Sequence, residues 1–442
     1  MKRKVRIGCG AGFSGDRLEP AVILAEKGEL DYLVLECLAE RTIALAQKRK
    51  ALDPEKGYDP LLEKRLDLLL PIIKKNNIRL ITNMGAANPI AALKKVIEIA
   101  RSKAISIKVA ALIGDDVYEL ISGNEIAIET NKPLKDSGQL ISANAYLGAD
   151  AILAALQTDA NVIITGRVAD PSLFLAPLIH EFNWDINDMQ LMGKGTVVGH
   201  LLECAGQISG GYFADPIKKL VENMSELGHP FVDVFEDGSA IVSKVKGTGG
   251  HIDLATAKEQ LLYEVTDPHE YYTPDVIADF TTVCLTDLGE DRVKVTGGGG
   301  KNKPSTLKVS VGYKAGFIGE GEISYAGPSA IQRAQLAGEI IKQRLGSTVS
   351  DLKIDYIGCS SLHQLSVSDI RGMEPYEIRL RVAGKMKTGE EAARIGEEVE
   401  ALYTNGPAGG GGVRKYVNEV VGIVSTLINR VEVHHSVIIE ES

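Results

Sequence analysis

The sequence lacks several features that mark other classes of protein. Its five cysteines, Cys9, Cys37, Cys204, Cys284 and Cys359, are odd in number, widely spaced and never form a CxxC pair. This excludes a disulfide framework and gives no zinc or iron–sulfur spacing. No apolar run approaches the ~18 residues of a membrane span, and residues 1–15 lack the apolar stretch of a signal peptide. We expect a cytoplasmic protein with reduced thiols and no membrane partner.

Basic residues are scarce relative to acidic ones. The chain has 49 Lys and Arg against 59 Asp and Glu, a net charge of −10, which repels a phosphate backbone and argues against nucleic acid as a partner. Aromatic residues make up only 5% of the chain, whereas hydrophobic residues make up 44% and there are 46 glycines. This composition is typical of a globular protein with an aliphatic core and close backbone approaches.

The order of strand and helix patterns predicts the fold. Strands are expected at 5–8, 32–35, 78–82, 107–113 and 161–165, and helices at 18–27, 59–76, from 88 onward and at 142–156. This alternation predicts an α/β part over residues 1–238, with a mostly parallel, doubly wound, Rossmann-like sheet. Beyond Gly238 strands are shorter and closer together, which predicts a mixed α+β part over residues 239–442 with a glycine-rich C-terminal loop.

The first strand is followed by a glycine-rich turn, Gly8–Arg17. Small residues at such a turn let backbone N–H groups approach an anion at a helix N-terminus. However, the turn lacks the third glycine of a dinucleotide-binding loop, and the charge of Asp16 would repel a phosphate. Nicotinamide or flavin binding is therefore disfavoured. We favour a substrate-binding loop in which Asp16 and Arg17 point into a cleft; a tight turn carrying a solvated ion pair is the structural alternative.

Polar residues also follow three later strands. Because the carboxyl ends of strands in an open α/β sheet build its binding site, we expect a cleft that holds Asn83, Asp115, Arg167 and Asp170. Asp115 or Asp170 would act as an acid or a metal ligand. The planar guanidinium of Arg167 suits a carboxylate or phosphate, so Arg167 would hold the carboxylate of a substrate. A position before proline also gives Asp170 a purely structural interpretation as a helix N-cap.

The segment Gly199–Gln207 carries the densest group of reactive side chains. If it is helical, His200, Glu203, Cys204 and Gln207 share one face. His200 would be a general base, with Glu203 tuning or replacing it, and Cys204 a small buried hydrophobe. A divalent metal bound by His200 and Glu203 stays open, since it requires further oxygen ligands from elsewhere. The alternative is a helix face that points to a partner or to solvent.

Three further residues are candidates. Tyr212 could be an acid or an oxyanion donor, and His251 a second imidazole. The loop Gly406–Arg414 contains four consecutive glycines, which cost backbone entropy. It therefore suggests close approach to a ligand or a neighbouring subunit, with Arg414 supplying charge; a floppy loop is the alternative.

The order of these motifs resembles the acyclic terpene utilisation AtuA family. The matching segments are Gly10–Arg17, Thr82–Pro89, Ser142–Gly148, Ile164–Pro171, Gly199–Cys204, Gly210–Asp215 and Gly406–Gly412. The resemblance covers nearly the whole chain and implies a link to catabolism of citronellol- and geraniol-type branched acids through acyl-CoA intermediates. Longer relatives carry an additional C-terminal segment that looks ferredoxin-like. The resemblance therefore implies a small ferredoxin-like companion protein as a partner.

These observations predict a catabolic enzyme that acts on a small or branched carboxylate or its acyl-CoA thioester. With no redox-cofactor loop, P-loop or nucleophile elbow, acid–base chemistry is left, and a hydro-lyase (hydratase or dehydratase) fits best. A non-catalytic binding or assembly subunit of an acyl-CoA catabolic complex is the main alternative, and an oxidoreductase ranks last. We expect a homo- or hetero-oligomer.

Overall fold

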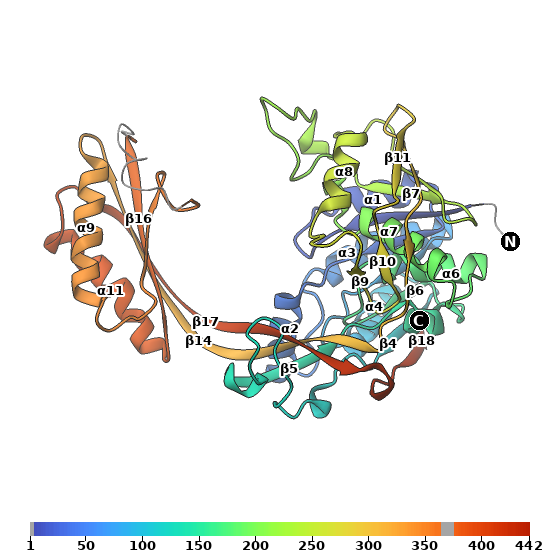
Figure 1. The fold of residues 1–442 in the computed structure, drawn as a ribbon, viewed down its shortest axis with the longest axis horizontal. Helices are drawn as coiled ribbons and strands as arrows, with labels where there is room; N and C mark the ends of the chain where they lie inside the picture. The colour runs from blue at the N-terminus through green and yellow to red at the C-terminus, as the bar shows by residue number, and fades with distance from the viewer. Residues whose placement is uncertain (1–3, 364–374) are drawn as a thin grey trace. The chain divides into compact units, whose positions relative to one another are not determined.

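The structure is a computed structural model that describes residues 4–363 and 375–442, and the chain forms two compact units (Figure 1). Unit 1 comprises Met1–Asp136, Leu140–Gly312 and Ile423–Ser442, and unit 2 comprises Ser137–Gln139 and Tyr313–Gly422. The division expected near residue 238 therefore falls inside unit 1. The later antiparallel strands there extend the N-terminal sheet, since one sheet can carry parallel and antiparallel strands together.

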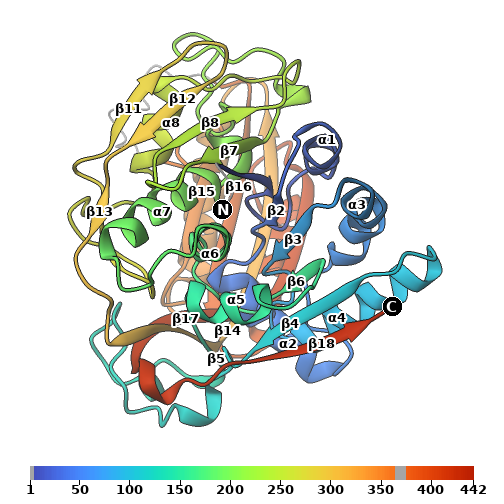
Figure 2. The same ribbon diagram turned by 90° about the vertical axis from the view of Figure 1, so that its right-hand side faces the viewer.

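Unit 1 is built on a ten-stranded mixed sheet in the order β11-β12-β8-β7-β1-β2-β3-β6-β4-β18 (Figure 2). The five strands β1, β2, β3, β6 and β4 are parallel to one another. Antiparallel strands flank this parallel part on both sides. The sheet strands are β1 (Val5–Ala11), β2 (Tyr32–Leu35), β3 (Arg79–Thr82), β4 (Lys108–Ile113), β6 (Val162–Ile164), β7 (Pro230–Val234), β8 (Ala240–Lys244), β11 (Cys284–Asp287), β12 (Val293–Thr296) and β18 (Ser436–Glu441).

Helices cover both faces of this sheet, as expected for an α/β unit. Helices α1, α3 and α4 pack together on one face, and α5, α6 and α7 pack together on the other (Figure 2). The helices of unit 1 are α1 (Glu19–Lys27), α2 (Glu40–Leu52), α3 (Leu62–Asn76), α4 (Pro89–Ser102), α5 (Ala149–Leu156), α6 (Ser172–Phe182), α7 (Met189–Leu202) and α8 (Leu254–Leu262). A separate three-stranded sheet contains β9 (Tyr271–Tyr272), β10 (Ile277–Asp279) and β13 (Gly299–Gly300).

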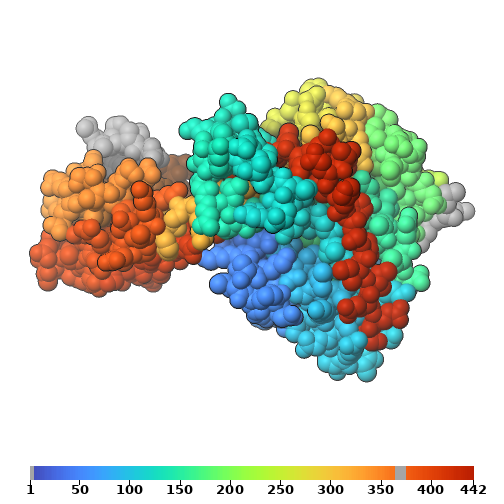
Figure 3. Space-filling view, turned by 90° about the horizontal axis from the view of Figure 1, so that it is seen from below, coloured from blue at the N-terminus to red at the C-terminus, as the bar shows by residue number. Residues whose placement is uncertain are grey.

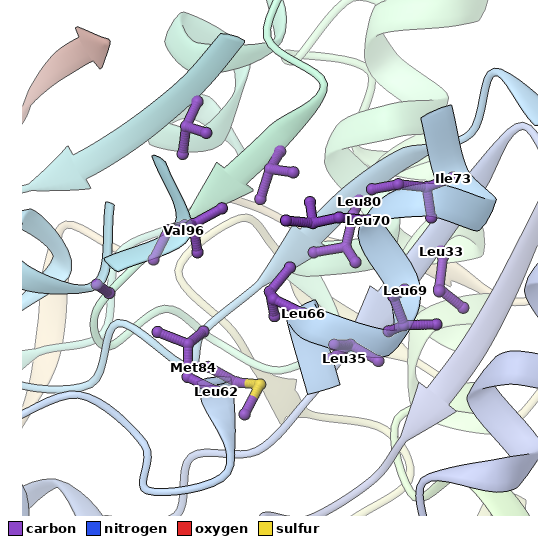
Figure 4. Packing of buried hydrophobic residues seen from close by; sticks show 14 of the residues in the cluster. Leu33, Leu35, Leu62, Leu66, Leu69, Leu70, Ile73, Leu80, Met84 and Val96 are labelled. Carbon is purple, nitrogen blue, oxygen red and sulfur yellow. The ribbon is translucent and has the colours of Figure 1, made fainter. Parts of the chain in front are cut away.

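The main core lies between the sheet and the α1–α3–α4 layer (Figure 4). Leu62, Leu66, Leu69 and Ile73 of α3 recur at helical spacing and are buried, so they form one apolar stripe. The stripe packs against leucines of β2 and β3. The helix ends at Asn77, whose left-handed φ of 53° suits asparagine at this position.

Two expectations about local structure were wrong. Residues 142–156 do not form one helix: Gln139–Ala145 is strand β5, which pairs with β14, and α5 begins only at Ala149. The prediction therefore gave Ser142–Ala145 the periodicity of a helix, whereas these residues belong to a strand. Helix α2 was not predicted; its mixed sequence carries few apolar residues to give a periodic stripe.

Unit 2 has its own core and a βαββαβ order. It contains β14 (Thr306–Ala326), α9 (Ala330–Leu345), β15 (Lys353–Ile357), β16 (Glu377–Met386), α11 (Gly389–Asn405) and β17 (Gly411–Asn429), and β14 and β17 also continue into unit 1. The sheet order is β15-β16-β14-β17, and both helices pack on β16. This is a ferredoxin-like arrangement, so the chain carries one such unit itself. A separate companion protein stays a prediction.

The surface of unit 1 bears the C-terminal segment, which runs along its outside (Figure 3). It ends in β18, which pairs with β4 from Ser436 to Glu441. Among the described residues, none of the helices combines the length and the apolar character that spanning a bilayer requires.

Candidate functional site

The candidate site lies where the parallel strands of unit 1 end. Asn83 follows β3, Asp115 comes just after β4, and Arg167 comes just after β6. Parallel strands place these ends on one edge of the sheet. The structure brings the three residues together with Asp170, as the spacing predicted, and adds Glu36, which follows β2 directly.

Asp115 supports the backbone beneath the site. Only 4% of the residue is exposed, and its carboxylate accepts hydrogen bonds from the backbone N–H of Arg167 (2.8 Å) and the amide of Asn144 (3.0 Å). Burial raises the pKa of Asp115 to about 6. A Cβ at Gly166 would lie 2.5 Å from this carboxylate, so the turn requires glycine. Asp115 thus holds the Arg167 turn in place.

Arg167 is buried and committed to protein groups. Its guanidinium donates to the carbonyls of Leu38 and Val168 and to the carboxylate of Asp170, and it stacks 4.5 Å from the ring centroid of Tyr146. These contacts use four of the five N–H donors of a guanidinium. The expected role of Arg167 as a clamp for a substrate carboxylate is therefore not favoured; it orders Asp170 instead.

Glu36 and Asn83 form a second buried pair at the same edge. The Asn83 amide donates to Glu36 Oε1 (2.8 Å), and Asn83 Oδ1 accepts from the backbone N–H of Cys37 (2.7 Å). Burial raises the pKa of Glu36 well above its usual range; the Asp170 charge adds to the rise and the Arg167 charge opposes it. Asn83 is thus a positioning group for Glu36 and is wholly buried.

His200 and Glu203 meet at the end of α7. The helix ends at Leu202, so the expected continuous face that includes Cys204 and Gln207 does not form. The i,i+3 pair nevertheless survives, with His200 Nδ1 lying 2.8 Å from Glu203 Oε1. The imidazole packs against the rings of Tyr271 and Phe280, with centroids 5.2 and 5.3 Å away.

The electrostatics of this pair favour two neutral groups. Burial lowers the pKa of His200 to about 4. Burial raises the pKa of Glu203 well above its usual range, and the charges of Asp170 and Glu264 raise it further. Both His200 Nε2 and Glu203 Oε2 are buried without a hydrogen-bond partner. A neutral imidazole nitrogen either donates or accepts, so the proton between Nδ1 and Oε1 belongs to the imidazole in one tautomer and to the carboxyl group in the other.

Asp170 opens into a cavity of about 430 Å³. Its side chain is 37% exposed and pairs with Arg167. Tyr146, Tyr271 and Lys308 line the same cavity. The other walls are mostly apolar and include Ile128, Pro171, Pro274, Pro304, Leu307 and Leu427. A largely apolar cavity with a few polar groups is typical of a small-molecule site.

A second cavity, of about 420 Å³, lies at the glycine-rich turn and is lined by Asp16, Arg17, Cys204 and Tyr212. The Asp16 carboxylate accepts from the N–H groups of Gly12 (2.7 Å) and Phe13 (3.3 Å). It thereby takes the position that a phosphate would need, so the geometry of the turn disfavours nicotinamide binding.

Arg17 and Tyr212 have little support as ligands of a buried substrate. Arg17 donates to the carbonyls of Met224 (3.2 Å) and Ser225 (2.8 Å). Tyr212 is 88% exposed at the mouth of the second cavity. Arg17 therefore anchors the loop that contains Met224, and Tyr212 faces solvent.

The remaining two candidates lie elsewhere. His251 lines a separate open groove and has Nε2 3.7 Å from Asp253. Arg414 is exposed on β17 in unit 2. The structure therefore brings neither residue to the Asp170 cavity.

Four residues of the site were missed. The position of Glu36 directly after a strand could have identified it, because the same rule found Asn83 and Arg167. Tyr271, Lys308 and the buried His229 of the second cavity come from distant segments with no recognisable spacing. Within residues 4–363 and 375–442 no three His, Cys, Asp or Glu side chains converge as a metal site, so a metal at His200 and Glu203 gains no geometric support.

Comparison with known proteins agrees with the motifs. A family model described as acyclic terpene utilisation family protein AtuA matches residues 5–439. Comparison with curated proteins and with solved structures gives no match. The match to the family model spans nearly the whole chain, both units included, and the chain therefore belongs to the acyclic terpene utilisation AtuA family.

Proposed function

We propose that the protein is a catabolic hydro-lyase that acts on a small or branched carboxylate, or its acyl-CoA thioester, by acid–base chemistry. The observation that carries the proposal is a pair of carboxyl groups in contrasting environments. Glu203 pairs with a neutral imidazole, whereas Asp170 pairs with a guanidinium. Environments that separate the protonation of two neighbouring carboxyls are how acid and base roles are divided in enzymes.

In this proposal Glu203 is the general acid. Burial and the charges of Asp170 and Glu264 raise its pKa, which favours the protonated carboxyl group, and the hydrogen bond with His200 holds the side chain in place. His200 itself is a positioning residue, since it is 1% exposed and its Nδ1 is engaged with Glu203. This positioning role replaces the prediction that His200 acts directly as a base.

Asp170 is the general base. Burial raises the pKa of Asp170, but the Arg167 charge opposes that rise and favours the carboxylate. Asp170 removes a proton from the carbon next to the substrate carbonyl, and the electrons of that C–H bond form the C=C bond. As the C–O bond breaks, Glu203 gives its proton to the leaving hydroxide, which departs as water. Hydration is the same sequence in reverse.

The apolar walls of the Asp170 cavity support a substrate with a hydrocarbon chain. The family is described as acting in acyclic terpene utilisation, a setting that supplies branched apolar chains. The reaction type and the choice between free acid and thioester belong to the proposal.

The first test is a thermal-shift screen with branched 3-hydroxy acids, their 2,3-unsaturated counterparts and the CoA thioesters of both. A ligand at about 100 times its dissociation constant adds ~2.7 kcal/mol to stability. Stabilising compounds are then incubated with the protein in D₂O, and mass spectrometry measures hydration, dehydration and deuterium uptake at the carbon next to the carbonyl.

Glu203→Gln and Asp170→Asn should each lower turnover by about 10²–10⁴-fold, as expected for loss of a proton-transfer group. Asp159→Asn is the matched control, because the Asp159 side chain is 96% exposed. Wild-type turnover in Glu203→Gln would remove the acid from the mechanism. Ligand binding without any turnover would instead favour the non-catalytic binding subunit.

A further inference from the structure

The Asp170 cavity contains one cationic side chain. Among the described residues that line it, Lys308 is the only lysine or arginine. Arg167 lies behind the wall and is 1% exposed. A negatively charged ligand group that enters the cavity therefore has Lys308 as its cationic partner.

Lys308 is held in place but keeps donors to spare. Its backbone carbonyl accepts from the N–H of Tyr146 (2.8 Å), which fixes the strand at this point. Its ammonium donates to Glu40 Oε1 (2.6 Å) and lies 5.4 Å from the ring centroid of Tyr146. An ammonium has three N–H donors, and the Glu40 contact uses one of them.

Glu40, the acid that pairs with Lys308, has a second hydrogen-bond partner. Glu40 also accepts a hydrogen bond from the hydroxyl of Tyr146 (3.1 Å). The Lys308 side chain is 45% exposed, so its ammonium can turn toward a ligand while Glu40 keeps the bond from Tyr146. Asp170, in the same cavity, repels an anion and so directs a ligand carboxylate toward Lys308.

We propose that Lys308 anchors the carboxylate of an apolar monocarboxylic acid whose chain packs on the walls formed by Pro171, Leu307 and Leu427. The proposal rests on the proposed function for the role of the cavity and narrows its substrate to the free acid. An uncharged thioester carbonyl would gain little from an ammonium, whereas a carboxylate forms a charge-assisted hydrogen bond.

The test compares 4-methylpentanoate with 4-methylpentanamide, which has nearly the same shape without the charge. Calorimetry on the full chain should show that the wild type binds the acid about tenfold more tightly than the amide, as one charged hydrogen bond can supply. In Lys308→Met the acid should bind no more tightly than the amide, because the cation is lost and the charge of Asp170 remains. Lys308→Gln keeps a donor without the charge and should also lose the preference.

Lys415→Met is the matched control. The Lys415 side chain is 42% exposed, pairs with Glu400, and lies in unit 2, so this variant should keep the preference for the acid. Equal binding of both ligands by the wild type, no detectable binding of the acid, or an unchanged preference in Lys308→Gln would each overturn the anchor.

The outcome is separable from that for the proposed function. A charge preference that depends on Lys308, found in a protein that turns nothing over, supports the anchor and refutes the lyase. Turnover of thioesters that Lys308→Met leaves unchanged supports the lyase and refutes the anchor.

Discussion

His200 offers a direct test of the electrostatic account of the site. Its ring is buried against Tyr271 and Phe280, which stack on each other, and its pKa is lowered to about 4 because burial disfavours the charged imidazolium. His200→Phe keeps an aromatic ring of similar size in that position and removes the titrating group. The variant also loses the hydrogen bond to Glu203, so it should be less stable than the wild type at neutral pH.

The pH dependence follows from linkage. Well above pH 6.5, the ordinary pKa of histidine, the imidazole is neutral in the folded and in the unfolded chain. The lowered pKa of His200 then does not change the free energy of unfolding. Below that pH the unfolded chain binds a proton that the folded chain excludes, so stability falls as pH falls toward 4. With these two pKa values, His200 should lower the free energy of unfolding of the wild type by about 2 kcal/mol as the pH falls from about 7.5 to about 5. His200→Phe should lack this loss.

Trp184 provides the assay. It is the only tryptophan of the chain, it is buried in unit 1, and its indole N–H donates to the carbonyl of Glu236. Urea unfolding followed by its fluorescence therefore reports on unit 1. The stability difference between wild type and His200→Phe should shrink by about 2 kcal/mol on going from pH 7.5 to pH 5. His269→Phe, at an exposed imidazole, is the control. Parallel pH curves for wild type and His200→Phe would refute the buried neutral histidine.

Two further changes test how the site is supported. Gly12→Ala places a Cβ 2.4 Å from the carbonyl carbon of Cys204. Because backbone atoms cannot move aside as a flexible side chain can, the free energy of unfolding measured by Trp184 fluorescence should fall by roughly 1–3 kcal/mol or more. Gly411→Ala, in unit 2, has no atom within 4 Å of the new Cβ. It should change stability by less than about 0.5 kcal/mol when urea unfolding is followed by circular dichroism, which detects both units. Asp253→Ala removes the N-cap of α8 and should cost about 1 kcal/mol in the same assay, and an unchanged midpoint would contradict that capping role.

The sequence predicted the edge of the sheet well because the rule behind it is geometric. Asn83, Asp115 and Arg167 each follow a strand, and parallel strands must place these residues at one edge. Their roles were harder to predict. Whether Arg167 is free to bind a substrate depends on the carbonyls of Leu38 and Val168, and no local pattern reveals where those carbonyls point.

The failures have identifiable physical causes. The helix face beginning at His200 was extended past Leu202, where the helix ends, because side-chain spacing does not show where backbone hydrogen bonds stop. Lys308 reaches the cavity through pairing of its strand with Tyr146, a contact between segments far apart in sequence. The boundary near residue 238 confused a change in strand direction within one sheet with a change of domain.

The proton content of the site follows from its charge balance. Burial raises the pKa of Glu36, Asp170 and Glu203, and the charge of Asp170 raises the pKa of the two glutamates further; Arg167 is the buried cation that opposes all three rises. An unpaired buried charge costs several kcal/mol, so a single guanidinium can support about one of these carboxylates. The direct contact of Arg167 is with Asp170, so the charge balance favours the protonated forms of Glu36 and Glu203. In the proposed mechanism this balance supplies the proton that Glu203 transfers and the carboxylate of Asp170 that acts as base. That arrangement makes Glu203, which also has an unpartnered oxygen, the group whose replacement should most affect the chemistry.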